Sequence, residues 1–184
     1  MFSKFDRSKL NLLPLACREN DLTLEVIRLL GPSEQIDPDL YRVAKAIVEA
    51  RSRGASVILM MGAHVIRSGV QPFLIDMIEK GYISCIATNG AAAIHDYEFS
   101  MIGETTESVA RYINEGQFGL WKETGELNTL IRDNAHTGQG AGEIIGRAIH
   151  ESSYPHKDIS VFAAACRNKI PITVHIGLGY DIIH

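Results

Sequence analysis

Two short apolar runs constrain the fold of this 184-residue chain more than any other feature. They are SVILMM at 56–61 and YISCIAT at 82–88, and neither contains a charged residue. Continuous apolar runs of this length are typical of strands covered on both faces, as in parallel sheets. The segment between them, VQPFLIDMIEKG, predicts a helix over 70–81, with proline in its first turn and glycine at its end. Strand, helix and strand in this order predict a parallel crossover.

Further segments on both sides extend this unit. Residues 37–54 predict a helix that Asp37 caps and Gly54 ends, with an apolar stripe at helical spacing. The other expected elements are helices at 91–102, 106–115, 121–132, 142–152 and 158–169, and a third strand at 171–177. The expected class is α/β, a three-layer Rossmann-like parallel sheet flanked by helices. We expect 1–35 to form an N-terminal arm with a short strand or helix, and 36–184 to form a nucleotide-binding domain. Because the third strand leads into a turn where the sequence stops, we interpret this domain as the front part of a larger one.

Composition excludes several classes of function. The net charge is −4, the basic residues are dispersed and aromatic residues are scarce, which argues against a nucleic-acid partner. No secretory hydrophobic region is visible, and the longest apolar stretch, VILMMGAHVI, is too short to span a bilayer, so we expect a cytoplasmic protein without a membrane partner. Cys17, Cys85 and Cys166 lack CxxC spacing, and we expect them to be small buried hydrophobic residues in a reducing compartment.

Three loops that follow the predicted strands carry the candidate binding residues. In open α/β sheets, ligands collect at the carboxyl ends of the strands, where loops and helix N-termini converge. Small residues in these loops let a ligand approach the backbone, although they also simply make tight turns. Taken together, the three loops favour binding. The positions expected to contact a ligand there are Gly62, His64, Ser68, Gly69, Thr88, Asn89 and Gly90, with Asp181 in the third loop.

The segment HDYE after the second loop carries the candidate catalytic residues. On a helix, His95 and Glu98 share a face, whereas Asp96 points about 100° away. Acidic residues here suit a cationic substrate, and His95 suits proton transfer near neutral pH. A purely structural interpretation, with Asp96 as a helix cap on a solvated surface, fits the residues equally well. Asp181 is the further acidic residue expected at this site.

Other motifs point away from other chemistries. GQGAG at 138–142 fails as a dinucleotide fingerprint because Glu143 stands at the next position and no buried strand precedes it. Despite seven histidines, the sequence has neither HExxH nor CxxC spacing, so no metal site is expected. A GxSxG nucleophile elbow is also absent from the sequence.

The stretch GAHVIRSGVQPFLIDMIEKGYISCIATNGAAAIHDYEFSMIG resembles the first nucleotide-binding segment of the deoxyhypusine synthase family, and HKDISVFAAACRNKIPITV and LGYDIIH are similar to its later segments. The resemblance covers roughly residues 40–184. It implies a Rossmann-like sheet that binds NAD, in a homo-oligomer, usually a tetramer. It places His64, Ser68, Thr88, Asn89 and Gly90 at the dinucleotide. His95, Asp96, Glu98 and Asp181 fall near the polyamine. The family's nucleophilic lysine segment is not in this sequence, so deoxyhypusine synthesis is not expected.

AAAIHDYE also resembles a segment of the archaeal-type ornithine cyclodeaminases, the LOR/SDH-related family. That resemblance implies an enzyme that uses bound NAD as a transient hydride acceptor from a small amine or amino acid. A rival hypothesis from another class is a non-catalytic nucleotide-binding or assembly module.

Overall fold

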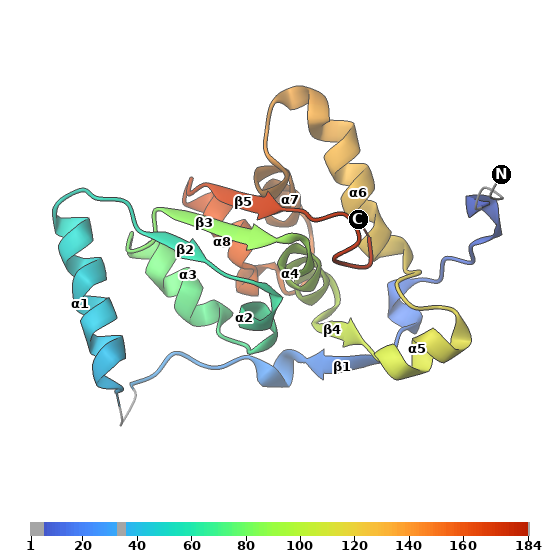
Figure 1. Cartoon of the computed structure of the whole chain (residues 1–184), viewed down its shortest axis with the longest axis horizontal. Coiled ribbons are helices and arrows are strands. Elements are labelled where there is room, and N and C mark those ends of the chain that lie inside the picture. Colours follow the sequence, from blue (N-terminus) through green and yellow to red (C-terminus); the bar gives the residue numbers. More distant parts are fainter. Residues whose placement is uncertain (1–5, 33–35, 184) are drawn as a thin grey trace.

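The computed structural model describes residues 6–32 and 36–183, and a three-stranded parallel sheet lies at its centre. The strands are β2 (Ile58–Met60), β3 (Cys85–Asn89) and β5 (Ile172–His175), in the spatial order β2-β3-β5 (Figure 1). Both pairs are parallel, with Leu59 opposite Ile86 and Ile86 opposite Ile172. The parallel crossover and the third strand predicted from the sequence are therefore confirmed.

The described part of the chain also contains eight α-helices. Their bounds are α1 Pro38–Ser52, α2 Ala63–Arg67, α3 Gln71–Glu79, α4 Gly90–Ile102, α5 Val109–Glu115, α6 Lys122–Asn134, α7 Ala141–Glu151 and α8 Val161–Arg167. Five single 3₁₀ turns complete them: Arg7–Lys9, Leu15–Cys17, Leu24–Val26, Ala135–Thr137 and Lys157–Ile159. The α/β class with a parallel sheet flanked by helices is thus as predicted. Two elements were missed, the five-residue helix α2 inside the expected loop and a short strand at the start of the expected helix 106–115.

That short strand joins the N-terminal arm to the rest of the molecule. β4 (Glu104–Glu107) pairs antiparallel with β1 (Asn20–Thr23), which lies in the arm. Farther along, the Gly69 carbonyl accepts a hydrogen bond from the Arg28 amide at 2.8 Å. A Cβ at Gly69, whose φ is +75°, would lie 1.9 Å from the Val26 carbonyl oxygen. The arm therefore packs closely on the domain, and this packing is what requires glycine at position 69.

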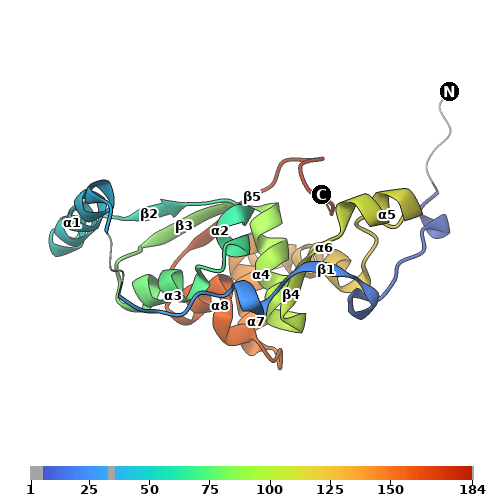
Figure 2. The same cartoon turned by 90° about the horizontal axis from the view of Figure 1, so that it is seen from below.

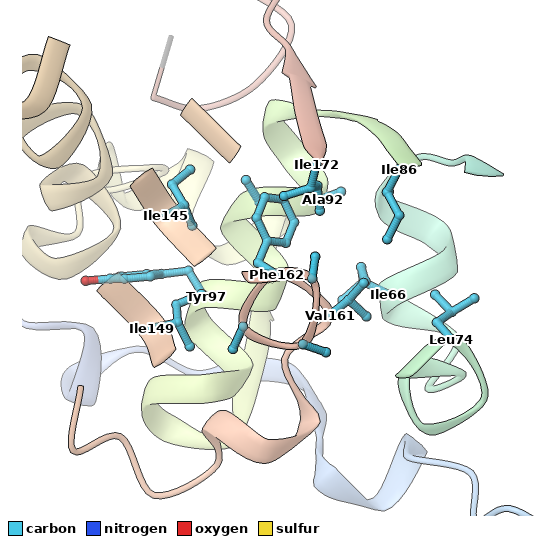
Figure 3. Packing of buried hydrophobic residues seen from close by; sticks show 14 of the residues in the cluster. Ile66, Leu74, Ile86, Ala92, Tyr97, Ile145, Ile149, Val161, Phe162 and Ile172 are labelled. Atoms are coloured by element: carbon cyan, nitrogen blue, oxygen red, sulfur yellow. The ribbon is translucent and has the colours of Figure 1, made fainter. Parts of the chain in front are cut away.

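The hydrophobic core lies under one face of the sheet, around α4 and α8. Phe162 and Val161 of α8 pack among Ile172, Ile66 and Ala92 (Figure 3). The glycines of α7 let this helix approach closely. A Cβ at Gly142 would lie 2.0 Å from the Ile172 carbonyl oxygen, and one at Gly146 would lie 2.6 Å from that of Phe162. The last glycine of GQGAG thus serves helix packing.

The opposite face of the sheet is open in the described part of the chain. α3, α4, α7 and α8 all lie on the core side, and α1 lies beyond the start of β2 (Figure 2). Alternation from the partly buried Leu59 directs Ile58 and Met60 to the open face, where they are 59% and 81% exposed. The expectation that 56–61 is covered on both faces is therefore wrong for this chain, because β2 is an edge strand with helices on one side only.

Two smaller expectations are also corrected. The apolar stripe of α1 is exposed, and no residue of that helix is buried. Cys17 is exposed, and Cys85 and Cys166 are partly buried, so only the latter two approach the buried role expected of them. Among the described residues, no helix combines the length and apolar character that crossing a membrane demands.

Candidate functional site

Helix α4 carries the expected catalytic segment from the carboxyl end of β3 into the core. Its start is fixed by Asn89, whose side-chain Oδ1 accepts the Ala92 amide at 3.0 Å, and its end by Gly103 at φ +70°. The helix is apolar over most of its circumference, as expected for a central helix. Its few polar side chains therefore need partners from other elements.

Glu98 has three such partners, which together donate four hydrogen bonds. Its carboxylate, 1% exposed, accepts two hydrogen bonds from the Arg18 guanidinium at 2.8 and 2.6 Å. It also accepts the hydroxyls of Thr105 and Thr124, each at 2.6 Å. Four donors occupy the lone pairs that a carboxylate offers. We call Arg18, His95, Glu98, Thr105 and Thr124 the α4 polar network. Glu98 is thus committed to holding this network together, with little capacity left for a ligand.

His95 joins the network through its Nδ1, which lies 2.7 Å from Thr105 Oγ1. Because the single hydroxyl hydrogen of Thr105 is donated to Glu98, Thr105 can only accept from His95, and Nδ1 carries the imidazole hydrogen. Burial lowers the pKa of His95 from 6.5 to about 4, and the nearby positive charge of Arg67 acts in the same direction. His95 is therefore neutral at pH 7 and has an unprotonated Nε2.

Asp96 points away from this network, as its helical position predicts. Its carboxylate accepts the Ser160 hydroxyl and the backbone amides of Val161 at 2.9 Å and Phe162 at 3.3 Å. It therefore caps the N-terminus of α8 from another helix. Burial raises the pKa of Asp96 from 3.8 to about 6, against the opposing effect of these hydrogen bonds. The geometry supports the structural interpretation of Asp96 and separates it from the other catalytic candidates.

A cavity of about 330 Å³ lies beside α4, and we call it the α4 pocket. Its charged or titratable lining residues come from the arm, α2, α4, β4 and the tail after β5: Arg18, Asp21, Arg67, His95, Glu98, Glu107, Tyr180 and Asp181. Of the four predicted catalytic residues, His95, Glu98 and Asp181 meet here, and Asp96 does not. Among the described residues, no group of three or more His, Cys, Asp or Glu is placed to hold a metal ion.

A second, shallower cavity of about 400 Å³ lies at the carboxyl ends of the three parallel strands, and we call it the edge pocket. It is lined by Met60, Met61, Gly62, Ala87, Thr88, Asn89 and His175. Three predicted binding positions, Gly62, Thr88 and Asn89, therefore come together. Thr88 Oγ1 is buried and has no hydrogen-bond partner among the described residues.

The other predicted binding positions are placed differently. Gly90 is buried as the first residue of α4, and His64 is exposed on α2. Ser68 and Gly69 follow the far end of α2, where the Ser68 hydroxyl donates to the Val65 carbonyl at 2.8 Å and Gly69 contacts the arm. The structure thus gives Ser68 and Gly69 local roles and leaves the edge pocket to the ends of β2 and β3.

Together, the parallel sheet, its crossover and the cavities at its carboxyl edge define a Rossmann-fold α/β protein. Residues 41–130 match a family model described as arginine dihydrolase ArgZ-like, C-terminal, Rossmann fold. The chain is also similar to the ornithine cyclodeaminase of Methanothermobacter thermautotrophicus, with 31% identity over 64 residues, 35% of this chain and 16% of that enzyme.

The solved structures that share the fold include the following two. One is AgrE in a ternary complex with ornithine and NAD+, at 21% identity and TM-score 0.51, covering 77% of this chain and 19% of AgrE. The other is a LOR/SDH protein of Methanococcus maripaludis S2, at 21% identity and TM-score 0.51, covering 85% of this chain and 46% of that protein. This chain therefore spans less than half the length of each of these relatives. The matches support the predicted resemblance to ornithine cyclodeaminases, whereas the resemblance to deoxyhypusine synthase stays a prediction.

Sequence reasoning missed two arginines of the α4 pocket. Arg18 lies in the arm, and its proximity to Glu98 follows from the pairing of β1 with β4, across 80 residues of sequence. Arg67 was within reach of sequence analysis, since it is the one Lys or Arg between Gly54 and Lys80 and lies in the same segment as the predicted binding positions.

Proposed function

We propose that this chain binds NAD across the carboxyl edge of its sheet and places a small amine or amino acid beside it in the α4 pocket. The observation that carries the proposal is the junction of β3 and α4. Thr88 and Asn89 line the edge pocket, and Ala91, two residues farther on, lines the α4 pocket. One short segment therefore contacts both cavities, as a site for a cofactor and its substrate requires.

The residues of the edge pocket fit a dinucleotide. Gly62 leaves room, since a Cβ there would meet only Asn89 Nδ2, at 3.7 Å. The buried, unpartnered hydroxyl of Thr88 offers a hydrogen bond, and the first amides of α4 favour a phosphate or carboxylate. When bound, NAD accepts a hydride from a carbon that bears nitrogen. AgrE in complex with ornithine and NAD+ is a structural precedent for this pairing of ligands.

The chain's own residues then bind and orient the second ligand. The neutral His95 can accept a hydrogen bond at Nε2 from a ligand ammonium. Thr105 and Glu98 hold the imidazole in this tautomer, and Asp181 supplies a carboxylate from the tail. The predicted homo-oligomer and cytoplasmic location stay predictions.

Thermal melts with and without NAD test the cofactor half of this proposal. At a hundredfold excess over its dissociation constant, a ligand of the native state adds about 2.7 kcal/mol, a shift of several degrees. Gly62→Leu should abolish this shift by filling the edge pocket. Gly140→Leu is the matched control, because both glycines are extended N-cap residues and a Cβ at Gly140 would meet nothing within 4 Å. We expect it to keep the shift.

Two outcomes contradict the proposal. An NAD shift that persists in Gly62→Leu would place the nucleotide away from the edge pocket. A cooperative melt of the unsubstituted chain that ignores NAD at millimolar concentration would remove the cofactor altogether.

A further inference from the structure

We propose that Arg67 binds the carboxylate of an α-amino acid in the α4 pocket, so that the pocket selects a basic amino acid over a polyamine. The inference rests on the proposed function and specifies its substrate class. It distinguishes the chemistries that the two sequence resemblances imply, because a polyamine has no carboxylate.

The first observation concerns the bonding of the two arginines that line the pocket. Arg18 is fully engaged with Glu98 and Asn20. Arg67 forms neither a hydrogen bond nor an ion pair with any described residue, and its Nε is buried without a partner. A buried donor without a partner is costly, and a planar guanidinium matches a carboxylate in a two-point contact. Arg67 is therefore a cation positioned for an anionic group that the described protein residues do not supply.

The second observation is the balance of the remaining charges. Arg18 neutralises Glu98, and the oxygens of Glu107 accept hydrogen bonds from Trp121 and the Gly119 amide, which leave its negative charge in place. Asp21 and Asp181 also line the pocket, and neither forms an ion pair with a described residue. Arg67 is thus a cation without an ion-pair partner, in a pocket whose carboxylates other than Glu98 are not neutralised by any described cation. Ornithine and similar basic amino acids carry the complementary set, one carboxylate and two cationic groups, whereas a polyamine would bring only cations beside Arg67.

Binding of two matched ligands to the NAD-loaded protein tests the inference. Ornithine and 1,4-diaminobutane differ only in the carboxylate. Calorimetric titration of the unsubstituted chain should show ornithine binding about 10- to 100-fold more tightly, the range of a charged hydrogen-bonded contact. Arg67→Gln should weaken the binding of ornithine by that factor, and the binding of diaminobutane should be unchanged or tighter. Arg67→Lys keeps the positive charge but loses the planar guanidinium that makes two parallel hydrogen bonds. Its affinity for ornithine should therefore lie between those of the unsubstituted chain and Arg67→Gln. Arg53→Gln, an exposed cation at the end of α1, is the control and should bind as the unsubstituted chain does.

Each other outcome overturns the inference in a distinguishable way. Equal affinity for both ligands, or equal weakening of both by Arg67→Gln, would show that Arg67 does not recognise the carboxylate. If Arg67→Gln fails to fold, the comparison of ligands on the unsubstituted chain and on Arg67→Lys decides. Binding of neither ligand, with the NAD shift intact, would overturn this inference and leave the cofactor half of the proposed function standing. Loss of the NAD shift as well would overturn both.

Discussion

Helices α4 and α1 show how differently this chain treats charged and apolar residues. In α4, Asp96 and Glu98 are each only 1% exposed, and every carboxylate oxygen has a hydrogen-bond donor. In α1, Leu40 is 60% and Val43 54% exposed, and no other element of the described chain packs closely over them. The inner helix, although mostly apolar, buries two carboxylates, and the outer helix leaves most of its apolar stripe exposed.

The difference shows that the burial of an individual side chain in this fold depends on its partners as well as on its hydrophobicity. A buried carboxylate is tolerated where its hydrogen bonds and counter-charge are complete, and it becomes a strong liability when one partner is lost. An apolar side chain on an uncovered face contributes little to the stability of the chain that carries it. The following predictions separate these two situations by the size of their effects.

The largest effect is expected from breaking the buried ion pair of Arg18 and Glu98. Glu98→Ala leaves the Arg18 guanidinium buried without its counter-charge and removes the acceptor of two threonine hydroxyls. We expect the free energy of unfolding to fall by about 3–5 kcal/mol, measured by urea denaturation. The control is Glu115→Ala, which breaks an exposed pair with Arg111 and should leave the unfolding midpoint almost unchanged. Similar effects of the two substitutions would contradict the assignment of the α4 polar network as a structural centre.

A medium effect is expected on the pH dependence of stability, because the pKa values of the neighbouring residues His95 and Asp96 are shifted in opposite directions. The pKa of Asp96 is raised from 3.8 to about 6, so its contribution is full below pH 3.8 and is lost as the pH rises through 6. The pKa of His95 is lowered from 6.5 to about 4, so its contribution is full above pH 6.5 and is lost as the pH falls through 4. Between pH 4 and 6, the contribution of Asp96 to the free energy of unfolding therefore decreases as the pH rises, whereas that of His95 increases.

Single substitutions should therefore uncover the two slopes separately. Relative to the unsubstituted chain, the stability of Asp96→Asn should rise with pH between 4 and 6, and that of His95→Gln should fall. Asp96→Asn should also cost roughly 1–3 kcal/mol near neutral pH, because an amide cannot accept all the hydrogen bonds at the start of α8. Unfolding midpoints in urea at half-unit pH steps measure both slopes. If the unfolding midpoints of both variants, relative to the unsubstituted chain, changed with pH in the same direction, the opposite pKa shifts assigned to Asp96 and His95 would be contradicted.

The sequence predicted the elements whose pattern is local and missed those that depend on distant partners. The strands β3 and β5 and the helices α3, α4 and α7 follow from apolar runs, caps and glycine stops. The strand β4, with the sequence ETTE, has no such pattern, and it forms because residues 20–23 of the arm pair with it. The helix α2 has only five residues, fewer than helical periodicity requires for recognition.

The candidate site also contains features that follow from the local sequence and features that depend on distant partners. Helical geometry was enough to place His95 and Glu98 on one face and Asp96 on another. It could not show that Arg18 would arrive from the arm to neutralise Glu98, or that the α8 N-terminus would be the partner of Asp96. The open face of β2 could not be predicted from the sequence either. An apolar run indicates that a strand is suited to burial, but it does not show which element covers each face.

The smallest effect is expected on α1, where two whole side chains should matter less than one methyl group of the core. Leu40→Gln with Val48→Gln keeps good helix formers at exposed positions, so the free energy of unfolding should change by no more than about 0.5 kcal/mol. Ile149→Val, which removes a single methyl group from a residue that is 0% exposed, should cost about 0.5–1.5 kcal/mol. Urea denaturation at a fixed protein concentration compares the two. A loss of more than about 2 kcal/mol in the α1 variant would mean that this face is covered in solution. If a second copy covers it, as the predicted homo-oligomer requires, light scattering of the same variant should then report a smaller assembly.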